Sequence, residues 1–267
     1  MPVFFFALSQ VPGIDWGKAV LIFVILHFIM YPASNGYNSY MDRDEGSIGL
    51  LKKPPKATKE LFHLTMVMDA VVVLLSLFVN IIFVVCIIAT IAASHAYSYR
   101  KIRLKKYPIT GFLTVVLFQG ALTYFMVYNG ASLASPHQIP WHGMLISALL
   151  FGGFYPLTQI YQHEQDFKDG VRTVSYLLGV NGTFIFSGLL YLAAEMVLFF
   201  YFKKAHIEYF YLLQLFFIPV IAYFLIWWAK VRKSSSNADY HHTMRMNLIA
   251  AISMNLAFIL ILGMNIR

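Results

Sequence analysis

The amino-acid sequence predicts an all-α, polytopic membrane helix bundle that forms a single membrane domain over residues 1–267. The chain is 59% hydrophobic and only 12% charged, with a mean hydropathy of +0.66, whereas a soluble domain carries about 25% charged residues. Apolar runs of roughly 20 residues, the length that a helix needs to cross a bilayer, recur along the whole chain. They predict about eight membrane-spanning helices, at 16–36, 60–79, 81–99, 108–128, 142–161, 179–201, 207–230 and 242–264.

Two places along the chain need a closer interpretation. The apolar run 60–99 is twice the length of one span, so it must contain a turn, and Asn80 is the best position for it. Residues 3–8, Val-Phe-Phe-Phe-Ala-Leu, have the composition of the end of a further apolar helix that is cut off by the start of the sequence. A short interfacial segment fits the same residues equally well.

The basic residues predict how the bundle is oriented. Sixteen of the twenty Lys and Arg lie in the loops after the first, third, fifth and seventh predicted spans. Because loops rich in Lys and Arg remain in the cytoplasm, we expect a multi-pass protein of the plasma membrane, as in the bacterial inner membrane, with these loops inside the cell. The net charge of +8 then reflects topology and contact with anionic membrane lipids, not binding of nucleic acid.

Two segments of the chain, 31–46 and 155–170, are copies of one another, 124 residues apart. Each begins with Tyr-Pro inside a span, where a proline kinks a helix, and together they hold six of the twelve acids. An offset of four helices predicts two parallel repeats, about 16–128 and 142–264. Both acidic segments then lie on the cytoplasmic side and face each other.

The acids of the two segments predict a cation site. In each copy the polar positions step by three, four and three, at 35/38/42/45 and 159/162/166/169, which places them on one helix face. Two acidic clusters repel each other unless a cation lies between them. Oxygen ligands suit Mg²⁺, which commonly also binds a substrate phosphate. The chain has neither a Gly-rich phosphate loop nor Cys/His ligand spacing, which argues against a nucleotide triphosphatase or a zinc site.

Over nearly its whole length, the sequence resembles the UbiA family of intramembrane prenyltransferases. Asn38 and Asp42 match the family's Asn-xxx-Asp-xxx-Asp motif, and Asp166 matches the last acid of its Asp-xxx-Asp motif. Tyr97-Ser98, followed by Arg103-Leu104-Lys105, resembles the segment that closes the family's fourth helix. The resemblance implies the family's nine-helix bundle, with its first helix missing or truncated in this chain.

The sequence also departs from the family pattern at two positions. Gly46 replaces the third acid of the first motif, and Gln162 replaces the first acid of the second. Nearby acids can supply the missing charge.

The resemblance implies Mg²⁺-dependent transfer of an isoprenyl group from a polyprenyl diphosphate to a lipophilic or aromatic acceptor, similar to a quinone precursor, within the membrane. Ionisation of the donor would leave an allylic cation in an apolar cavity. The residues assigned to the reaction are Asn38, Asp42, Gln162 and Asp166. Those assigned to the metal are Asn38, Asp42, Glu45, Glu164, Asp166 and Asp169, and those assigned to the diphosphate are Arg103, Lys105, Lys168 and Arg172.

Two other functions remain open from the sequence. A multi-pass transporter also combines repeats with polar residues at a helix kink, although it predicts polar groups near the middle of the bilayer. A degenerate, non-catalytic family member is suggested by Gly46 and Gln162. His95 is expected either to line the cavity or to form a hydrogen bond between helices, and Asp69 and Glu195, both inside predicted spans, have no explanation in the pattern.

Overall fold

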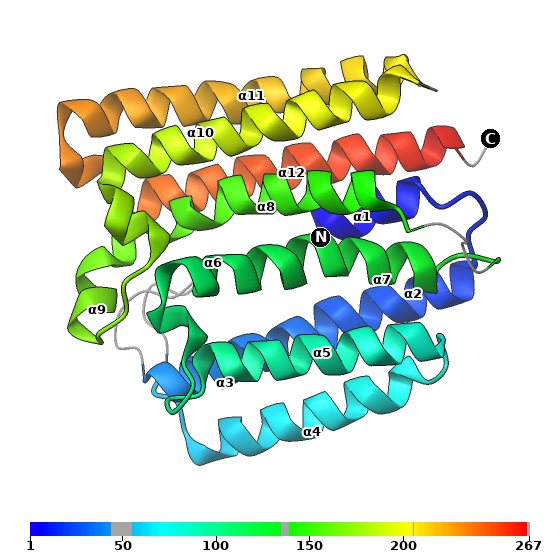
Figure 1. The fold of residues 1–267 in the computed structure, drawn as a ribbon, viewed down its shortest axis with the longest axis horizontal. Helices are drawn as coiled ribbons and strands as arrows, with labels where there is room; N and C mark the ends of the chain where they lie inside the picture. The colour runs from blue at the N-terminus through cyan, green and yellow to red at the C-terminus, as the bar shows by residue number, and fades with distance from the viewer. Residues whose placement is uncertain (44–54, 135–138, 205, 266–267) are drawn as a thin grey trace.

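The computed structural model describes residues 1–43, 55–134, 139–204 and 206–265, and within these ranges the regular elements are helices (Figure 1). The expected fold class is therefore confirmed. An isolated β-bridge between Ile14 and Ser132 is the one exception in the described part of the chain. The proposed metal ligand Glu45 lies outside the described residues.

Seven helical segments of the described chain are long and apolar enough to cross a membrane. The second predicted span, 60–79, is not among the seven; it forms helix α4 (Lys59–Ser76), which carries three charged residues in eighteen. α4 packs against α3 and α5. The seven segments are Trp16–Asp42 (α2 Trp16–Val24, η1 Ile25–Met30, α3 Tyr31–Asp42), α5 (Ile81–Ser98), Pro108–Gly130 (α6 Pro108–Val115, η3 Val116–Leu122, α7 Thr123–Gly130), Trp141–Lys168 (α8 Trp141–Gln159, η4 Ile160–Gln162, α9 His163–Lys168), α10 (Val174–Lys203), α11 (Ile207–Lys233) and α12 (Tyr240–Asn265).

The turn predicted at Asn80 is confirmed. α4 ends at Ser76 and α5 begins at Ile81, and the Asn80 side chain accepts a 2.7 Å hydrogen bond from the backbone N–H of Phe83. A side-chain oxygen at this position satisfies one of the free N–H groups of the first helical turn. Asn80 also donates to Oδ1 of Asn129 at 3.2 Å, which joins the hairpin to α7.

Both segment prolines lie beside a departure from α-helical geometry. Pro32 follows directly on the π-helical turn η1, and Pro156 lies inside α8 shortly before the 3₁₀ turn η4. A proline has no N–H to donate, so the helix is interrupted or rewound near it. A second π-helical turn, η3, lies close by, because the Tyr31 and Thr123 hydroxyls are 3.3 Å apart.

The start of the sixth predicted span coincides with a kink in the helix. The expected range was 179–201, whereas α10 runs from Val174 to Lys203 and passes through Gly179, which has φ 65° and ψ 174°. These angles are not helical, so α10 consists of two helical stretches that meet at a kink at Gly179, where glycine adopts positive φ without steric cost. The Thr173 hydroxyl caps the new start by accepting from the N–H of Tyr176 at 3.1 Å.

Residues 3–8 belong to the short helix α1 (Pro2–Ser9), which packs against α7 and α12 inside the bundle. Phe6 is 1% exposed, and it stacks on Phe258 with a ring separation of 4.7 Å. The segment is thus part of the core and not an interfacial strip.

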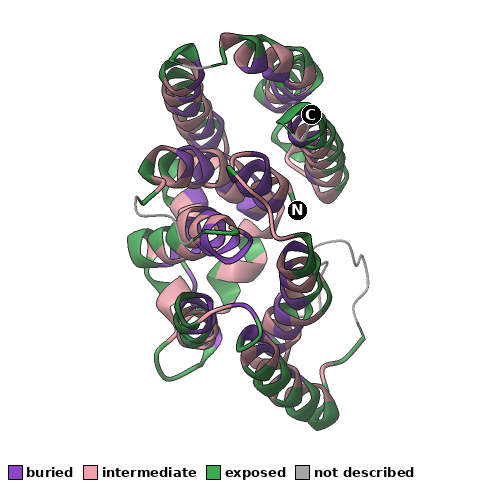
Figure 2. Ribbon diagram, turned by 90° about the vertical axis from the view of Figure 1, so that its right-hand side faces the viewer, coloured by how far each residue is buried: buried purple, intermediate pink, exposed green. Residues whose placement is uncertain are grey.

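The outer surface of the bundle is apolar. Seen along the helix axes in Figure 2, the exposed faces point outward and the buried faces point inward. Large apolar residues such as Phe78, Ile81 and Ile218 are more than half exposed. Apolar residues on both faces of a helix are typical of membrane spans.

Candidate active site

The two acidic segments line one cavity of about 550 Å³ at the end of the bundle where α3, α5 and α9 end or begin. Asn38 and Asp42 come from α3, whereas Gln162 and Asp166 come from η4 and α9. Asp169, directly after α9, lies on the same cavity. The structure thus brings these five predicted site residues together.

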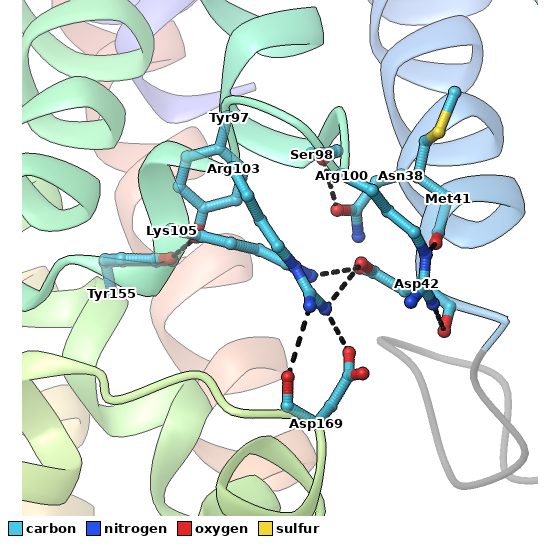
Figure 3. A network of polar contacts seen from close by, with 10 residues as sticks. All are labelled: Asn38, Met41, Asp42, Tyr97, Ser98, Arg100, Arg103, Lys105, Tyr155 and Asp169. Atoms are coloured by element: carbon cyan, nitrogen blue, oxygen red, sulfur yellow. Dashed lines mark hydrogen bonds and ion pairs between the residues drawn. The ribbon is translucent and has the colours of Figure 1, made fainter.

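Asp42 is the most enclosed acid of the site. Its side chain is only 3% exposed, and Oδ2 forms an ion pair with Nζ of Lys105 (Figure 3). Nη2 of Arg103 lies 3.7 Å from its other oxygen, Oδ1. A buried carboxylate is stable only when such partners offset its lost hydration.

Arg103 joins the two acidic segments. Its guanidinium donates to the backbone oxygen of Asp169 at 3.1 Å and also pairs with the Asp169 carboxylate, while it remains beside Asp42. Figure 3 shows the Arg103 guanidinium between these two acids, one at the end of α3 and the other directly after α9. The backbone of Arg103 has φ 49°, a left-handed conformation that is rare for residues other than glycine.

The last turn of α3 is fixed by α5 and the residues that follow it. Ser98 donates a 2.5 Å hydrogen bond to Oδ1 of Asn38. Arg100 donates to the backbone oxygens of Met41 and Asp42, at 2.7 and 3.2 Å, and so satisfies carbonyl groups at the free end of the helix. The hydroxyls of Tyr97 and Tyr155 are in contact nearby (Figure 3).

The donor atoms on this cavity suit a hard cation. Among the described residues, no three His, Cys, Asp or Glu side chains group closely enough to hold a metal on their own. The cavity instead offers carboxylates and side-chain amides, and Oδ1 of Asp42 is buried without a hydrogen-bond partner. Because Mg²⁺ binds through one or two carboxylates and retains water and phosphate ligands, these residues fit that ion.

Three predicted site residues lie away from the cavity. Glu164 and Lys168 form a 2.8 Å ion pair with each other, one helical turn apart, with side chains that are 84% and 73% exposed. Arg172 is exposed and does not line the cavity. Of the four predicted diphosphate cations, Lys105 lines the cavity and Arg103 contacts its acids.

Several polar residues inside predicted spans line the cavity, among them His95, for which the sequence left open cavity lining and a hydrogen bond between helices; the structure shows both. Gln119 and Asn247 come from η3 and α12, and Asp69 and His95 from α4 and α5. The signal was present, since a polar or ionisable side chain inside a span is a functional candidate in its own right.

A second cavity of about 300 Å³ adjoins the first on the side toward α1. Its lining is mainly apolar, with residues from α1, α8 and α12, among them Phe4, Leu150 and Met254. The two cavities share Tyr31, Ser34, Asn35, Gln119, Phe151, Phe154 and Asn247.

The structure is that of a polytopic membrane protein whose main cavity is charged at one end and adjoins an apolar cavity behind it. The chain belongs to the UbiA prenyltransferase family, whose sequence profile matches residues 1–249. A comparison with curated proteins gave no match.

Solved structures show the same fold. A UbiA homologue from Aeropyrum pernix K1 without ligand aligns with a TM-score of 0.73 at 17% identity, over 97% of this chain and 95% of that one. A homologue from Archaeoglobus fulgidus bound to DMAPP and Mg²⁺ has a TM-score of 0.66 at 17% identity, over 97% and 93%. A digeranylgeranylglyceryl phosphate synthase has a TM-score of 0.62 at 22% identity, over 97% and 91%.

Proposed function

We propose that this protein is a Mg²⁺-dependent prenyltransferase that moves an isoprenyl group from a polyprenyl diphosphate to an aromatic acceptor, similar to a quinone precursor, within the membrane. One observation carries the proposal: acids from both segments and the cations Arg103 and Lys105 meet at one end of a cavity that continues into an apolar space. A prenyl diphosphate has the same division into a charged head and an apolar tail.

Asn38, Asp42, Gln162 and Asp166 would hold the metal, because all four line the same cavity with oxygen-bearing side chains. Mg²⁺ bound there supplies positive charge that stabilises the departing diphosphate. Lys105 and Arg103 lie beside Asp42, where they would bind diphosphate oxygens. Asp169 would hold Arg103 in place.

The prenyl chain would extend into the second cavity. Phe151 and Phe154 line the shared part of the two cavities, and Tyr31 lies there as well. Aromatic faces stabilise a cation through their quadrupoles, and the apolar walls keep water from the reactive carbon. The acidic segments would face the cytoplasm, which the excess of basic residues in their loops supports.

The metal-site assignment is tested with Asp42→Asn and Asp166→Asn in lipid nanodiscs. Geranyl diphosphate is supplied with 4-hydroxybenzoate, 1,4-dihydroxy-2-naphthoate or a glycerol-phosphate ether lipid, and products are identified by mass spectrometry. Removing one stabilising charge is expected to lower transfer about 10²-fold or more, and EDTA is expected to abolish it. Glu208→Gln, an exposed acid at the start of α11, is the control.

Other outcomes separate the alternatives. Full activity of Asp42→Asn, or activity that persists in EDTA, contradicts the metal assignment. Binding of geranyl diphosphate with no product from any acceptor indicates a non-catalytic member of the family. Movement of the unmodified donor across the membrane indicates a transporter.

A further inference from the structure

A histidine–aspartate pair lines the wall of the main cavity. Nε2 of His95 on α5 lies 2.9 Å from Oδ2 of Asp69 on α4, and both residues line the cavity. Their side chains are 29% and 14% exposed. Ionisable groups inside a membrane bundle are costly unless they pair or perform a function, and these two are paired and also reach the cavity.

The contacts of His95 define which ring nitrogen is available. A carboxylate can only accept a hydrogen bond, so Nε2 of His95 is the donor, and in the neutral imidazole Nδ1 is then the nitrogen with the lone pair. Among the described residues, Nδ1 has no hydrogen-bond partner. The ring of Tyr37 stacks on the imidazole at a centroid distance of 4.0 Å and an angle of 9°. The imidazole is thus oriented by a carboxylate and by an aromatic face, as a catalytic base requires.

The pair lies one helical turn deeper in the bundle than the charged end of the cavity. His95 precedes Ser98 by three residues on α5, and Ser98 holds the candidate metal ligand Asn38. Three residues of helix correspond to a rise of about 4.5 Å. This is the depth at which the first carbons of a bound prenyl diphosphate, and the acceptor atom that attacks them, would lie.

We infer that His95 is the general base of the transfer reaction and that Asp69 positions it, an inference that rests on the proposed function. The C–O bond of the donor breaks, and its electron pair leaves with the diphosphate. An electron pair of the acceptor, from a ring or from a hydroxyl oxygen, forms the new bond to the prenyl carbon. The acceptor's C–H or O–H proton passes to Nδ1 of His95, and the Asp69 carboxylate stabilises the resulting imidazolium.

The competing explanation is a structural clamp, in which the same hydrogen bond only holds α4 against α5. A clamp would affect folding and donor binding together with turnover. A base affects turnover alone, because the proton leaves the acceptor after the donor has bound.

The experiment compares His95→Gln and Asp69→Asn with two matched controls. His63→Gln replaces an exposed histidine of α4, and Glu195→Gln replaces a second bundle carboxylate, which pairs with Gln214 at 2.7 Å and does not line the cavity. Each protein in nanodiscs is assayed with geranyl diphosphate and the three acceptors named above. The kcat, the KM for geranyl diphosphate and the thermal midpoint are measured, together with the isotope effect of a ring-deuterated acceptor or, for an acceptor that reacts through its hydroxyl, of D₂O as the solvent.

We expect kcat of His95→Gln to fall about 10²- to 10⁴-fold, with a KM for geranyl diphosphate within about threefold of the original. A deuterium isotope effect on transfer should appear or grow, because proton removal becomes slow. Asp69→Asn should likewise lower kcat and leave the KM for geranyl diphosphate nearly unchanged. Asp69→Glu should recover part of the kcat. Both controls should remain close to the unmodified protein.

Three results would overturn the inference. A kcat of His95→Gln within about twofold of the original shows that His95 is not the general base. A parallel loss of donor binding, thermal midpoint and kcat shows that the pair is a structural clamp. If the unmodified protein binds geranyl diphosphate but transfers it to none of the acceptors, the proposed function fails and the role of His95 fails with it. If Asp42→Asn loses activity and His95→Gln does not, the proposed prenyl transfer is supported and the role of His95 as a base is not. The failure of the inference can therefore be told apart from the failure of the proposed function.

Discussion

The hydroxyl of Ser98 donates a 2.5 Å hydrogen bond to Oδ1 of Asn38, across the interface between α5 and α3. The two residues are 60 positions apart in sequence, and both line the cavity. Ser98 is 1% exposed, so little else can orient the amide from that side. The contact fixes the direction of a side chain that we propose as a metal ligand.

Ser98→Ala is expected to weaken metal binding without removing a ligand. Outer partners that orient a metal ligand change affinity by roughly 10- to 100-fold, so the Mg²⁺ concentration for half-maximal transfer should rise within that range. Titration of transfer against Mg²⁺ at saturating donor measures it. Ser76→Ala, which removes a buried hydroxyl bonded to its own helix at the backbone oxygen of Val73 and away from both cavities, is the control. An unchanged Mg²⁺ requirement in Ser98→Ala contradicts the assignment of Asn38.

Lys105→Ala is expected to raise the KM for the donor. The ammonium group is 12% exposed and pairs with Asp42 beside the proposed diphosphate position. A charge-assisted hydrogen bond contributes about 1.5–3 kcal/mol, which corresponds to roughly 10- to 100-fold in affinity. The neighbouring Lys106 is exposed, so Lys106→Ala isolates the effect of position from that of charge. Equal increases in the donor KM for the two substitutions would mean that Lys105 acts only through the overall surface potential and does not contact the diphosphate.

The sequence interpretation and the structure disagree on Glu164, and a substitution decides between them. The sequence assigns Glu164 to the metal, whereas the structure pairs it with Lys168 on the exposed side of α9. An exposed pair of this kind contributes little to stability. From the structure we expect Glu164→Gln to leave the Mg²⁺ requirement within about twofold of the original. An increase of tenfold or more would restore the sequence assignment.

Donor length should depend on the second cavity. Ala251 lines this space of about 300 Å³, and Ala251→Phe would fill much of it. Turnover of geranylgeranyl diphosphate should then fall about 5- to 150-fold relative to geranyl diphosphate, because overpacking an apolar site costs about 1–3 kcal/mol. Ile252→Phe is the control, since Ile252 is 52% exposed on the outside of α12. Competition between the two donors in one reaction measures the ratio of their turnover. An unchanged ratio would mean that the prenyl chain does not occupy the second cavity.

Features that depend on local chemistry were predictable from the sequence. Asn80 marks a turn because its side chain can cap the helix that follows, and the structure contains that cap. The sixth predicted span begins at Gly179, where the structure has a non-helical residue with φ 65° between two helical stretches of α10, because glycine adopts positive φ without steric cost. Seven of the spans follow from apolar length alone.

The site was only partly predictable, and the reason lies in rotation about helix axes. The hairpin centred near Asn80 places Asp69 and His95 at similar depth, which the sequence indicates. Whether their side chains face each other depends on packing between α4 and α5, and so on contacts distant in sequence. Glu164 was predicted as a metal ligand from its place in the acidic segment. Its four-residue spacing from Lys168 also fits a local ion pair, and the structure contains that pair.

The pairing of Asp42 with Lys105 and of Asp169 with Arg103 has a consequence for how ligands enter and leave. The charges of these four side chains already balance one another inside the protein, so a donor that arrives with its cation exchanges partners and adds little net charge to an apolar interior. Binding of the donor would thus replace ion pairs within the protein by ion pairs with the ligand. Donor affinity is then a difference between two sets of ion pairs, and when the diphosphate departs, the side chains that it engaged neutralise one another again.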